Sequence, residues 1–234
     1  MRILALDSSG LVAGVAVVEA EQTVAEYTVN YKKTHSQTLL PMLDEVAKMI
    51  ELDMDTIDAI AVAGGPGSFT GLRIGSATAK GLGLALDKPL IHVPTLEAMA
   101  YNLYGTPGII CPIMDARRNQ VYTGLYEADG EFKVLEDQMA VGIEELAEKL
   151  NKAGRKVTFL GDGVPVYREV LDEKLETAHC YAPAHMNRQR AAALGTLGIK
   201  YMLEGKTETA AEHRPDYLRV SQAERERKER LKEL

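Results

Sequence analysis

The sequence has few of the residues that build metal centres, disulfide frameworks or membrane anchors. Its two cysteines, Cys111 and Cys180, stand far apart and form no CxxC pair, which fits a reducing compartment. No stretch approaches the roughly 20 apolar residues of a membrane span, and the apolar run before Asp7 is too short for a signal peptide. We therefore expect a cytoplasmic protein with no membrane partner.

Histidine pairs at metal-binding spacing are missing. The five histidines include no i,i+4 pair and no HExxH motif, one of which a metal site on a helix would need. His179, Cys180 and His185 form a loose cluster without a recognised ligand spacing. A GxSxG nucleophile motif is also absent. We expect no metal, no cofactor and no catalytic residues in this chain.

An excess of positive charge is missing too. The formal net charge is -7 and the sequence pI is near 5.4, whereas proteins that hold nucleic acid on their own rely on Lys and Arg to neutralise phosphates. Any work on RNA or DNA would therefore need the basic surface of a partner.

What is present is a pattern of short strands followed by helices. Three runs rich in Val, Ile, Leu and Thr, at residues 2–9, 12–20 and 23–31, predict a meander of strands. Leu39 and Leu43 lie at helical spacing in the next segment, with Pro41 expected in its first turn. The remaining elements are a strand at 57–65, a helix from about residue 68, a strand at 88–94 and a helix at 95–105.

The second half begins this pattern again. Residues 108–137 contain three strand-like runs, and Asp115 ends the first of them as Asp7 ends the first run of the chain. A helix at 142–154, a strand at 156–163 and a helix at 186–205 follow. We interpret the chain as a degenerate duplication with lobes at 1–105 and 106–234, the second ending in a polar helix at 221–234.

Two such units, each with an Asp after its first strand, suggest an α/β fold of two ribonuclease H-like lobes, as in actin, Hsp70-type ATPases and sugar kinases. Asp7, Ser8 and Ser9 are then candidates for a vestigial phosphate loop. The matching segment after Asp115 is Ala-Arg-Arg-Asn, with no glycine to let the backbone approach a phosphate. A working ATP cleft is not expected.

The segment GGPGSFTG at 64–71 is not a standard phosphate loop. Gly71 is followed by Leu72 and Arg73, where a Walker loop needs Lys and then Ser or Thr, and Thr70 breaks the dinucleotide fingerprint. The N-terminus of the helix that follows could still hold an anion.

The glycines inside that helix form a ridge. Gly71, Gly75, Ala79 and Gly83 recur every fourth residue and so share one face. The three glycines together should cost about 3 kcal/mol in helix propensity, so a close contact must offset them. That contact is either the chain's own sheet and first helix or a helix of another chain.

Several of these segments resemble one known family. LALDSS at 4–9, HSQTLLP at 35–41, GGPGSFTGLRIGSATAKGLG at 64–83 and MDARRNQVY at 114–122 are similar to the TsaB (YeaZ) family, noncatalytic subunits in bacterial synthesis of threonylcarbamoyladenosine at position 37 of tRNA. The resemblance implies the actin and Hsp70 superfamily fold with a truncated second lobe and no catalytic metal. His35 has Leu39, not a second His, four residues later.

The resemblance also implies partners. Members of the family pair with the paralogue TsaD, which carries the metal and the transfer reaction, and the small ATPase TsaE joins them; tRNA is reached only through the complex. The two paralogues meet through their first two helices, which would place Leu39, Leu43, Gly71, Gly75 and Ala79 at the interface. The alternatives are a homodimer through the same ridge, an ATP-dependent phosphotransferase and a metallopeptidase-like enzyme.

Overall fold

Two sheets of the same strand order form the molecule. The computed structural model describes residues 1–31 and 34–218. The first sheet has the order β3-β2-β1-β4-β5 and the second β10-β9-β6-β7-β8, each with five strands. In each sheet the central strand, β1 or β6, is antiparallel to the strand after it and parallel to a later one, β4 or β9. The predicted duplication is therefore present in the topology.

The elements follow the order βββαβαβα twice. The first series is β1 (Arg2–Asp7), β2 (Val12–Glu19), β3 (Thr23–Asn30), α1 (His35–Met49), β4 (Ala59–Gly65), α2 (Phe69–Leu86), β5 (Leu90–Pro94) and α3 (Thr95–Tyr101). The second is β6 (Ile109–Asp115), β7 (Gln120–Glu127), β8 (Lys133–Gly142), α4 (Ile143–Ala153), β9 (Val157–Leu160), α5 (Val164–Lys174), β10 (His179–Tyr181) and α6 (Ala191–Leu203). The second series is truncated in length, with strands of 4 and 3 residues at β9 and β10.

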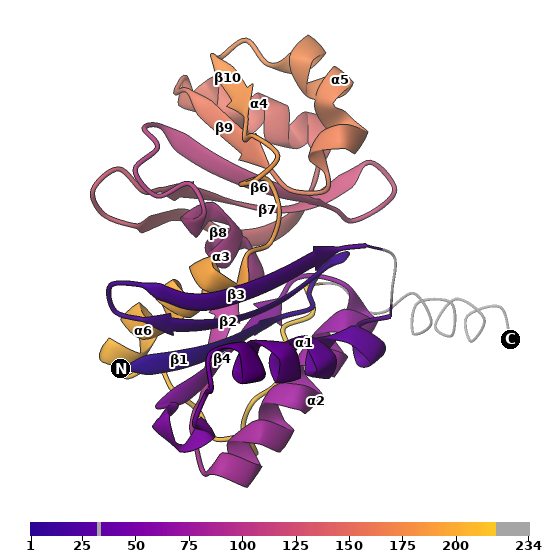
Figure 1. Cartoon of the computed structure of the whole chain (residues 1–234). Coiled ribbons are helices and arrows are strands. Elements are labelled where there is room, and N and C mark those ends of the chain that lie inside the picture. Colours follow the sequence, from indigo (N-terminus) through magenta and orange to yellow (C-terminus); the bar gives the residue numbers. More distant parts are fainter. Residues whose placement is uncertain (32–33, 219–234) are drawn as a thin grey trace, which may run out of the picture.

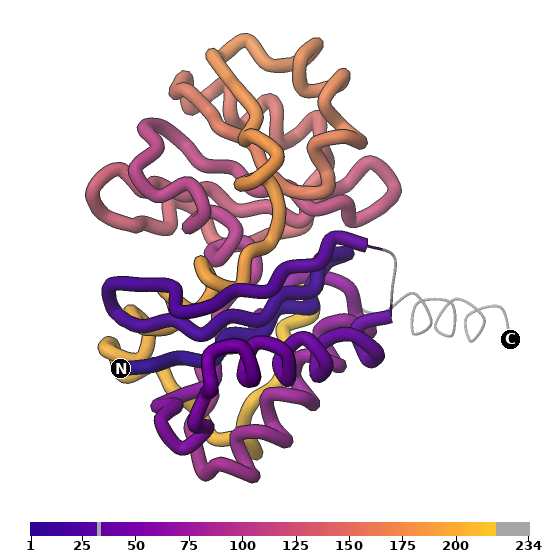
Figure 2. The backbone as a smooth tube through the Cα atoms, in the orientation of Figure 1, coloured from indigo at the N-terminus to yellow at the C-terminus, as the bar shows by residue number. Residues whose placement is uncertain are grey.

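The elements stack in layers (Figures 1 and 2). Helices α1 and α2 cover the outer face of the first sheet, α4 and α5 cover the outer face of the second, and α3 and α6 lie between the sheets. Strands β1, β2 and β4 are almost entirely buried, because their sheet is covered on both faces. Strand β3 lies at the edge and is largely exposed.

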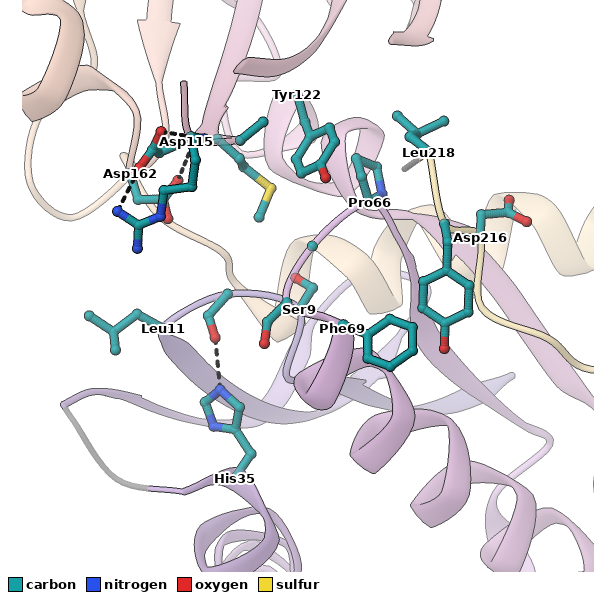
Figure 3. Close-up of a pocket in the computed structure, with 17 residues that line it drawn as sticks. Ser9, Leu11, His35, Pro66, Phe69, Asp115, Tyr122, Asp162, Asp216 and Leu218 are labelled. Atoms are coloured by element: carbon teal, nitrogen blue, oxygen red, sulfur yellow. Dashed lines mark hydrogen bonds and ion pairs between the residues drawn. The ribbon is translucent and has the colours of Figure 1, made fainter. Parts of the chain in front are cut away.

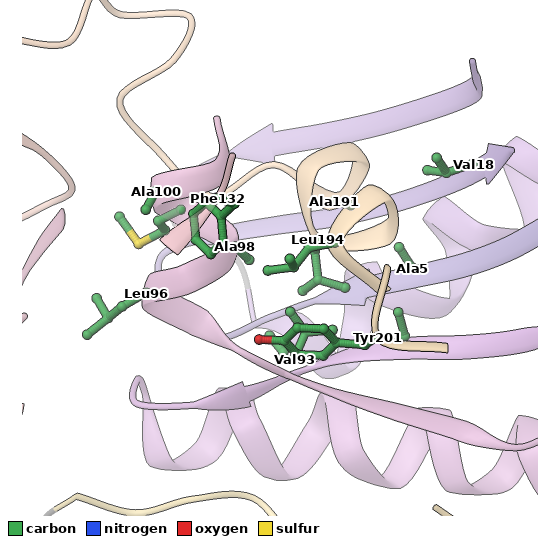
Figure 4. Close-up of a cluster of buried hydrophobic side chains, with 14 of the residues drawn as sticks. Ala5, Val18, Val93, Leu96, Ala98, Ala100, Phe132, Ala191, Leu194 and Tyr201 are labelled. Atoms are coloured by element: carbon green, nitrogen blue, oxygen red, sulfur yellow. The ribbon is translucent and has the colours of Figure 1, made fainter. Parts of the chain in front are cut away.

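Helix α6 ends the second series but packs on the first sheet. It contacts β1, β2 and β5, and Figure 4 shows its side chains among Ala5, Val18 and Val93. Gly195 allows this approach, since a β-carbon there would lie 2.7 Å from a methyl of Val18. The last described helix of the predicted lobe 106–234 therefore completes the core of the other sheet, and the lobe boundaries stay a prediction. The helix expected at 221–234 lies outside the described residues.

Three details differ from the sequence prediction. Pro41 is the seventh residue of α1 and not in its first turn. Its ring has no N–H to donate to the Gln37 carbonyl, and both residues are exposed to water, which can replace that bond. Helix α6 begins at Ala191, five residues later than predicted. Helix α5 and strand β10 were not predicted at all.

In the described residues no helix is both long and apolar enough to span a bilayer.

Candidate functional site

A cleft opens where β1 and β6 end, between the two sheets. Its volume is about 630 Å³. The first series lines it with the β1–β2 loop and the start of α2, the second with the β6–β7 loop, and the C-terminal segment closes one side, as Figure 3 shows for Ser9, Phe69, Asp115 and Asp216. Asp7 and Asp115 end the two equivalent strands, so the correspondence predicted between them is confirmed by the topology.

Asp7 is turned into the protein and bonded to its own loop. The residue is 1% exposed, and its Oδ1 accepts hydrogen bonds from Ser9 N at 2.8 Å and Ser9 Oγ at 2.6 Å. Burial raises the pKa of the carboxyl group, and the two bonds from Ser9 oppose that rise. Of the three residues predicted to form a vestigial phosphate loop, Asp7, Ser8 and Ser9, the described cleft is lined by Ser9.

The N-terminus of α2 is packed against the same loop. Ser9 O accepts a bond from Ser68 N at 2.6 Å, and the Ser68 side chain caps the helix by accepting from Gly71 N at 3.2 Å. A β-carbon at Gly67 would lie 2.3 Å from Ser9 O. The chain's own oxygens therefore use two of the N–H groups that could have held an anion.

The second loop has no glycine. Arg117, Arg118 and Asn119 are exposed and have φ of 66°, 56° and 56°, so side chains stand at each of these left-handed positions. Asp115 Oδ1 accepts from Arg117 N at 2.9 Å and from the Tyr167 hydroxyl at 3.0 Å. The Asp115 carboxylate is therefore already bonded within the second unit.

The charge of the cleft does not suit a polyphosphate. Its lining carries the carboxyl groups of Asp115, Asp162 and Asp216 against the guanidinium of Arg117, which is 87% exposed. Burial raises the pKa of Asp162, with smaller opposing effects from the Asp115 amide and Arg188. Carboxylates that hold no cation would repel an ATP phosphate chain.

The predicted interface residues face inward. Leu39 and Leu43 are 1% and 6% exposed, Ala79 is fully buried, and all three belong to the core between the first sheet and helices α1 and α2. A β-carbon at Gly71 would lie 2.0 Å from Ser8 O, and one at Gly75 would lie 2.6 Å from Ser8 Oγ. The contact that offsets Gly71 and Gly75 is therefore the chain's own β1–β2 loop, and the place of these five residues at a partner interface stays a prediction.

The opposite face of the same two helices is exposed. Ala77, Gly81 and Ala85 also recur every fourth residue of α2 and point away from the sheet. A β-carbon at Gly81 would have no described atom within 4 Å. Leu40 on α1 and Leu84 on α2 are 53% and 72% exposed. The spacing of Ala77, Gly81 and Ala85 in the sequence places this second ridge about half a turn from the first.

Two histidines of the first unit, His35 and His92, make contacts with residues far away in the sequence. His35 Nε2 lies 2.7 Å from Gly10 O, which ties the start of α1 to the β1–β2 loop. His92 lies with Glu208 and His213 in a group that could hold a metal ion, from segments far apart in sequence. A search for paired spacings could not have found this group.

Comparisons with known proteins agree with the fold. The family model described as TsaD, tRNA N6-adenosine threonylcarbamoyltransferase, matches residues 22–227. TsaB of Bacillus subtilis is 35% identical over 227 residues, which cover 96% of each chain. The crystal structure of YeaZ from Pseudomonas aeruginosa matches with a TM-score of 0.78 and 27% identity, over 93% of this chain and 99% of that one.

A more distant structure supports the fold class. The activator of 2-hydroxyisocaproyl-CoA dehydratase from Clostridium difficile, with bound ADPNP, matches with a TM-score of 0.51 at 13% identity, over 88% of this chain and 98% of that one, and shows the fold alone. The predicted α/β architecture of two lobes, each built on a mixed five-stranded sheet, is confirmed. By its match to the family model and its identity to the Bacillus protein, the chain belongs to the TsaB (YeaZ) family.

Proposed function

We propose that this chain is a noncatalytic accessory subunit in the synthesis of threonylcarbamoyladenosine in tRNA. The observation that carries the proposal is the 35% identity, over 96% of both chains, to a protein named for that pathway in Bacillus subtilis. A TsaD-like paralogue would transfer threonylcarbamoyl to N6 of adenosine 37, and a TsaE-like ATPase would join the pair. The net charge of -7 supports contact with tRNA through the complex.

The cleft supports an accessory role over an ATP-dependent one. Asp7 is buried and bonded to Ser9, and the carboxyl groups of the cleft lining outnumber its guanidinium. The loop after Asp115 has no glycine whose backbone a phosphate chain could approach closely. These observations favour an assembly function for the fold.

The exposed face of α1 and α2 is the docking surface that we propose for the paralogue. It presents small residues at Ala77, Gly81 and Ala85 and large apolar side chains at Leu40 and Leu84. Small residues at this spacing allow helices to pack closely. The transferase is the occupant because the transferase family model also matches this chain, and two chains of related fold can pair through equivalent helices about a near two-fold axis.

A matched pair of alanine substitutions tests this function. Ala77→Glu places a charge on the proposed surface, and Ala153→Glu places the same charge on the exposed end of α4. The chain is depleted from its own cells, each variant is expressed, and threonylcarbamoyladenosine in bulk tRNA is measured by nucleoside mass spectrometry. We expect the nucleoside to vanish on depletion, to return with wild type and Ala153→Glu, and not to return with Ala77→Glu.

Two outcomes would count against the proposal. A normal level of the nucleoside after depletion would remove the tRNA assignment. Full rescue by Ala77→Glu, with unchanged co-purification of the transferase, would refute the proposal that the transferase docks on the exposed face of α1 and α2. Sedimentation of the purified chain with and without the transferase would separate a homodimer on this face from the heterodimer.

A further inference from the structure

The C-terminal segment returns to the first sheet beside two histidines. Glu208 forms an antiparallel bridge with Leu90 of β5, through Leu90 N to Glu208 O at 2.8 Å and Glu208 N to Leu90 O at 2.9 Å. This pairing brings Glu208 next to His92 of the same strand. Five residues later His213 turns inward and is 1% exposed, and the Lys80 ammonium of α2 donates to its carbonyl at 3.2 Å.

The three side chains converge on one point. One ring nitrogen of His92, one of His213 and one carboxylate oxygen of Glu208 all lie within 4.8 Å of one another. The two imidazole rings have centroids 5.7 Å apart. His213 Nδ1 lies 2.6 Å from Glu208 Oε1. Two backbone bonds to Leu90 position Glu208, and a bond from the Lys80 side chain of α2 positions His213.

Part of this polar cluster is unsatisfied. His213 Nε2 is buried and makes no hydrogen bond with the described residues. His92 Nε2 is buried and makes no hydrogen bond either, although Asp216 Oδ2 lies 3.2 Å away as an ion-pair partner. Buried side-chain nitrogens almost always have a partner, and a metal ion would supply one. Glu208 and Asp216 add negative charge close to the two rings.

We propose that His92, Glu208 and His213 bind a divalent transition metal ion of the Zn²⁺ type. Two imidazoles and one carboxylate are a set that Zn²⁺ takes in proteins, with a fourth position left for water. His92 and Glu208 also line a surface cavity of about 390 Å³ that gives an ion access. The ion would fasten the C-terminal segment to β5, so its role is to clamp two parts of the chain.

Zinc titration of the complete, tag-free chain tests the site. After treatment with EDTA, the protein is titrated with Zn²⁺ alone by calorimetry, and thermal unfolding is followed with and without the ion. We expect one site per chain and a higher midpoint with Zn²⁺, since an ion that binds the folded state stabilises it. Substituting the ion with Co²⁺ should give visible absorption bands of a low-coordinate site.

Three single-residue variants distinguish Zn²⁺ binding at this site from non-specific binding to surface histidines. His92→Gln and Glu208→Gln should each weaken Zn²⁺ affinity by roughly tenfold or more. His185→Gln removes an exposed histidine elsewhere and should leave affinity unchanged. His92 and Glu208 are both partly buried, so the fold of each variant is checked by circular dichroism before titration. Absence of binding by wild type, or equal affinity in all three variants, would overturn the proposal; the tRNA measurement above does not depend on either result.

Discussion

The Ser8 hydroxyl donates a 2.8 Å hydrogen bond to the carbonyl oxygen of Gly71, across 63 residues of sequence. The contact is buried, and a β-carbon at position 71 would lie only 2.0 Å from the Ser8 carbonyl oxygen. The β1–β2 loop and the first turns of α2 are therefore one packed unit. Substitutions at Gly71 or Gly75 test folding and not docking.

Gly71→Ala and Gly81→Ala should shift stability in opposite directions. A β-carbon at position 71 meets backbone at 2.0 Å, whereas one at position 81 meets no described atom within 4 Å. We expect Gly71→Ala to lower the free energy of unfolding by about 1–3 kcal/mol through overpacking, and Gly81→Ala to raise it by up to roughly 1 kcal/mol through helix propensity. Urea unfolding measures both, and equal effects at the two sites would contradict the assignment of the inner face.

Asp7→Asn should remove a pH-dependent loss of stability. In the unfolded chain this carboxyl group titrates near 3.8, and burial raises its pKa in the folded chain. Between those two values the folded state holds the proton, so wild-type stability falls as pH rises through the window and then levels off. Each unit of pKa difference is worth about 1.4 kcal/mol.

The asparagine variant keeps the bonds but not the charge. Its side-chain oxygen can still accept from Ser9 N and Ser9 Oγ. The difference in unfolding free energy between variant and wild type should therefore grow in favour of the variant above pH 3.8 and persist at pH 7. Urea unfolding from pH 4 to 8 gives this curve, and a difference that is independent of pH would contradict it.

Glu26 and Arg190 should be strongly coupled. The Arg190 guanidinium forms two 3.1 Å bonds from Nε to the Glu26 carboxylate and a third from Nη2. Glu26 Oε1 also accepts from Ala192 N at 3.1 Å in the first turn of α6. Because Glu26 is 11% exposed and Arg190 is 39% exposed, Glu26→Ala should be the more harmful change, at about 2–3 kcal/mol. A double-mutant cycle with Arg190→Ala measures the coupling, and additive losses would show that the pair contributes little.

The two thiols should differ in reactivity. Burial raises the pKa of Cys111 to about 12, slightly opposed by a contact with Thr123 Oγ1, while Cys180 lies half-buried on β10. Iodoacetamide at pH 8 should alkylate Cys180 in the native protein and both residues in urea, as peptide mass spectrometry would show. Cys180→Ser should leave the native chain unlabelled, and native labelling of Cys111 would contradict this.

Local pattern predicted the elements with regular periodicity. The strands β1 to β3 followed from runs of branched residues, and the helix predicted from about residue 68 is α2, which the Ser68 side chain caps. Strand β10 has 3 residues, and α5 is a short helix with a proline in its first positions, so neither gives a clear periodic signal. Helix α6 is apolar on nearly all sides, which indicates burial but not which sheet it covers.

The candidate sites were predictable to different degrees. The equivalence of Asp7 and Asp115 could be inferred because each ends a first strand. The spacing of Gly71, Gly75 and Ala79 predicted a close contact, but spacing does not say which chain supplies it. His92, Glu208 and His213 come together only through the pairing of Glu208 with Leu90, and such long-range pairing leaves no mark in a local pattern.

The packing of α6, the last helix of the second series, on the first sheet has a consequence during protein synthesis. The first sheet is translated before residue 95, yet the helix that covers Ala5, Ala16 and Ala61 is translated almost 100 residues later. Until then the nascent chain presents an uncovered apolar surface at the ribosome exit, where a chaperone can bind it. The first sheet gains its covering helix only when about the last fifth of the chain is translated, so loss of α6 by premature termination would leave that sheet without a finished core.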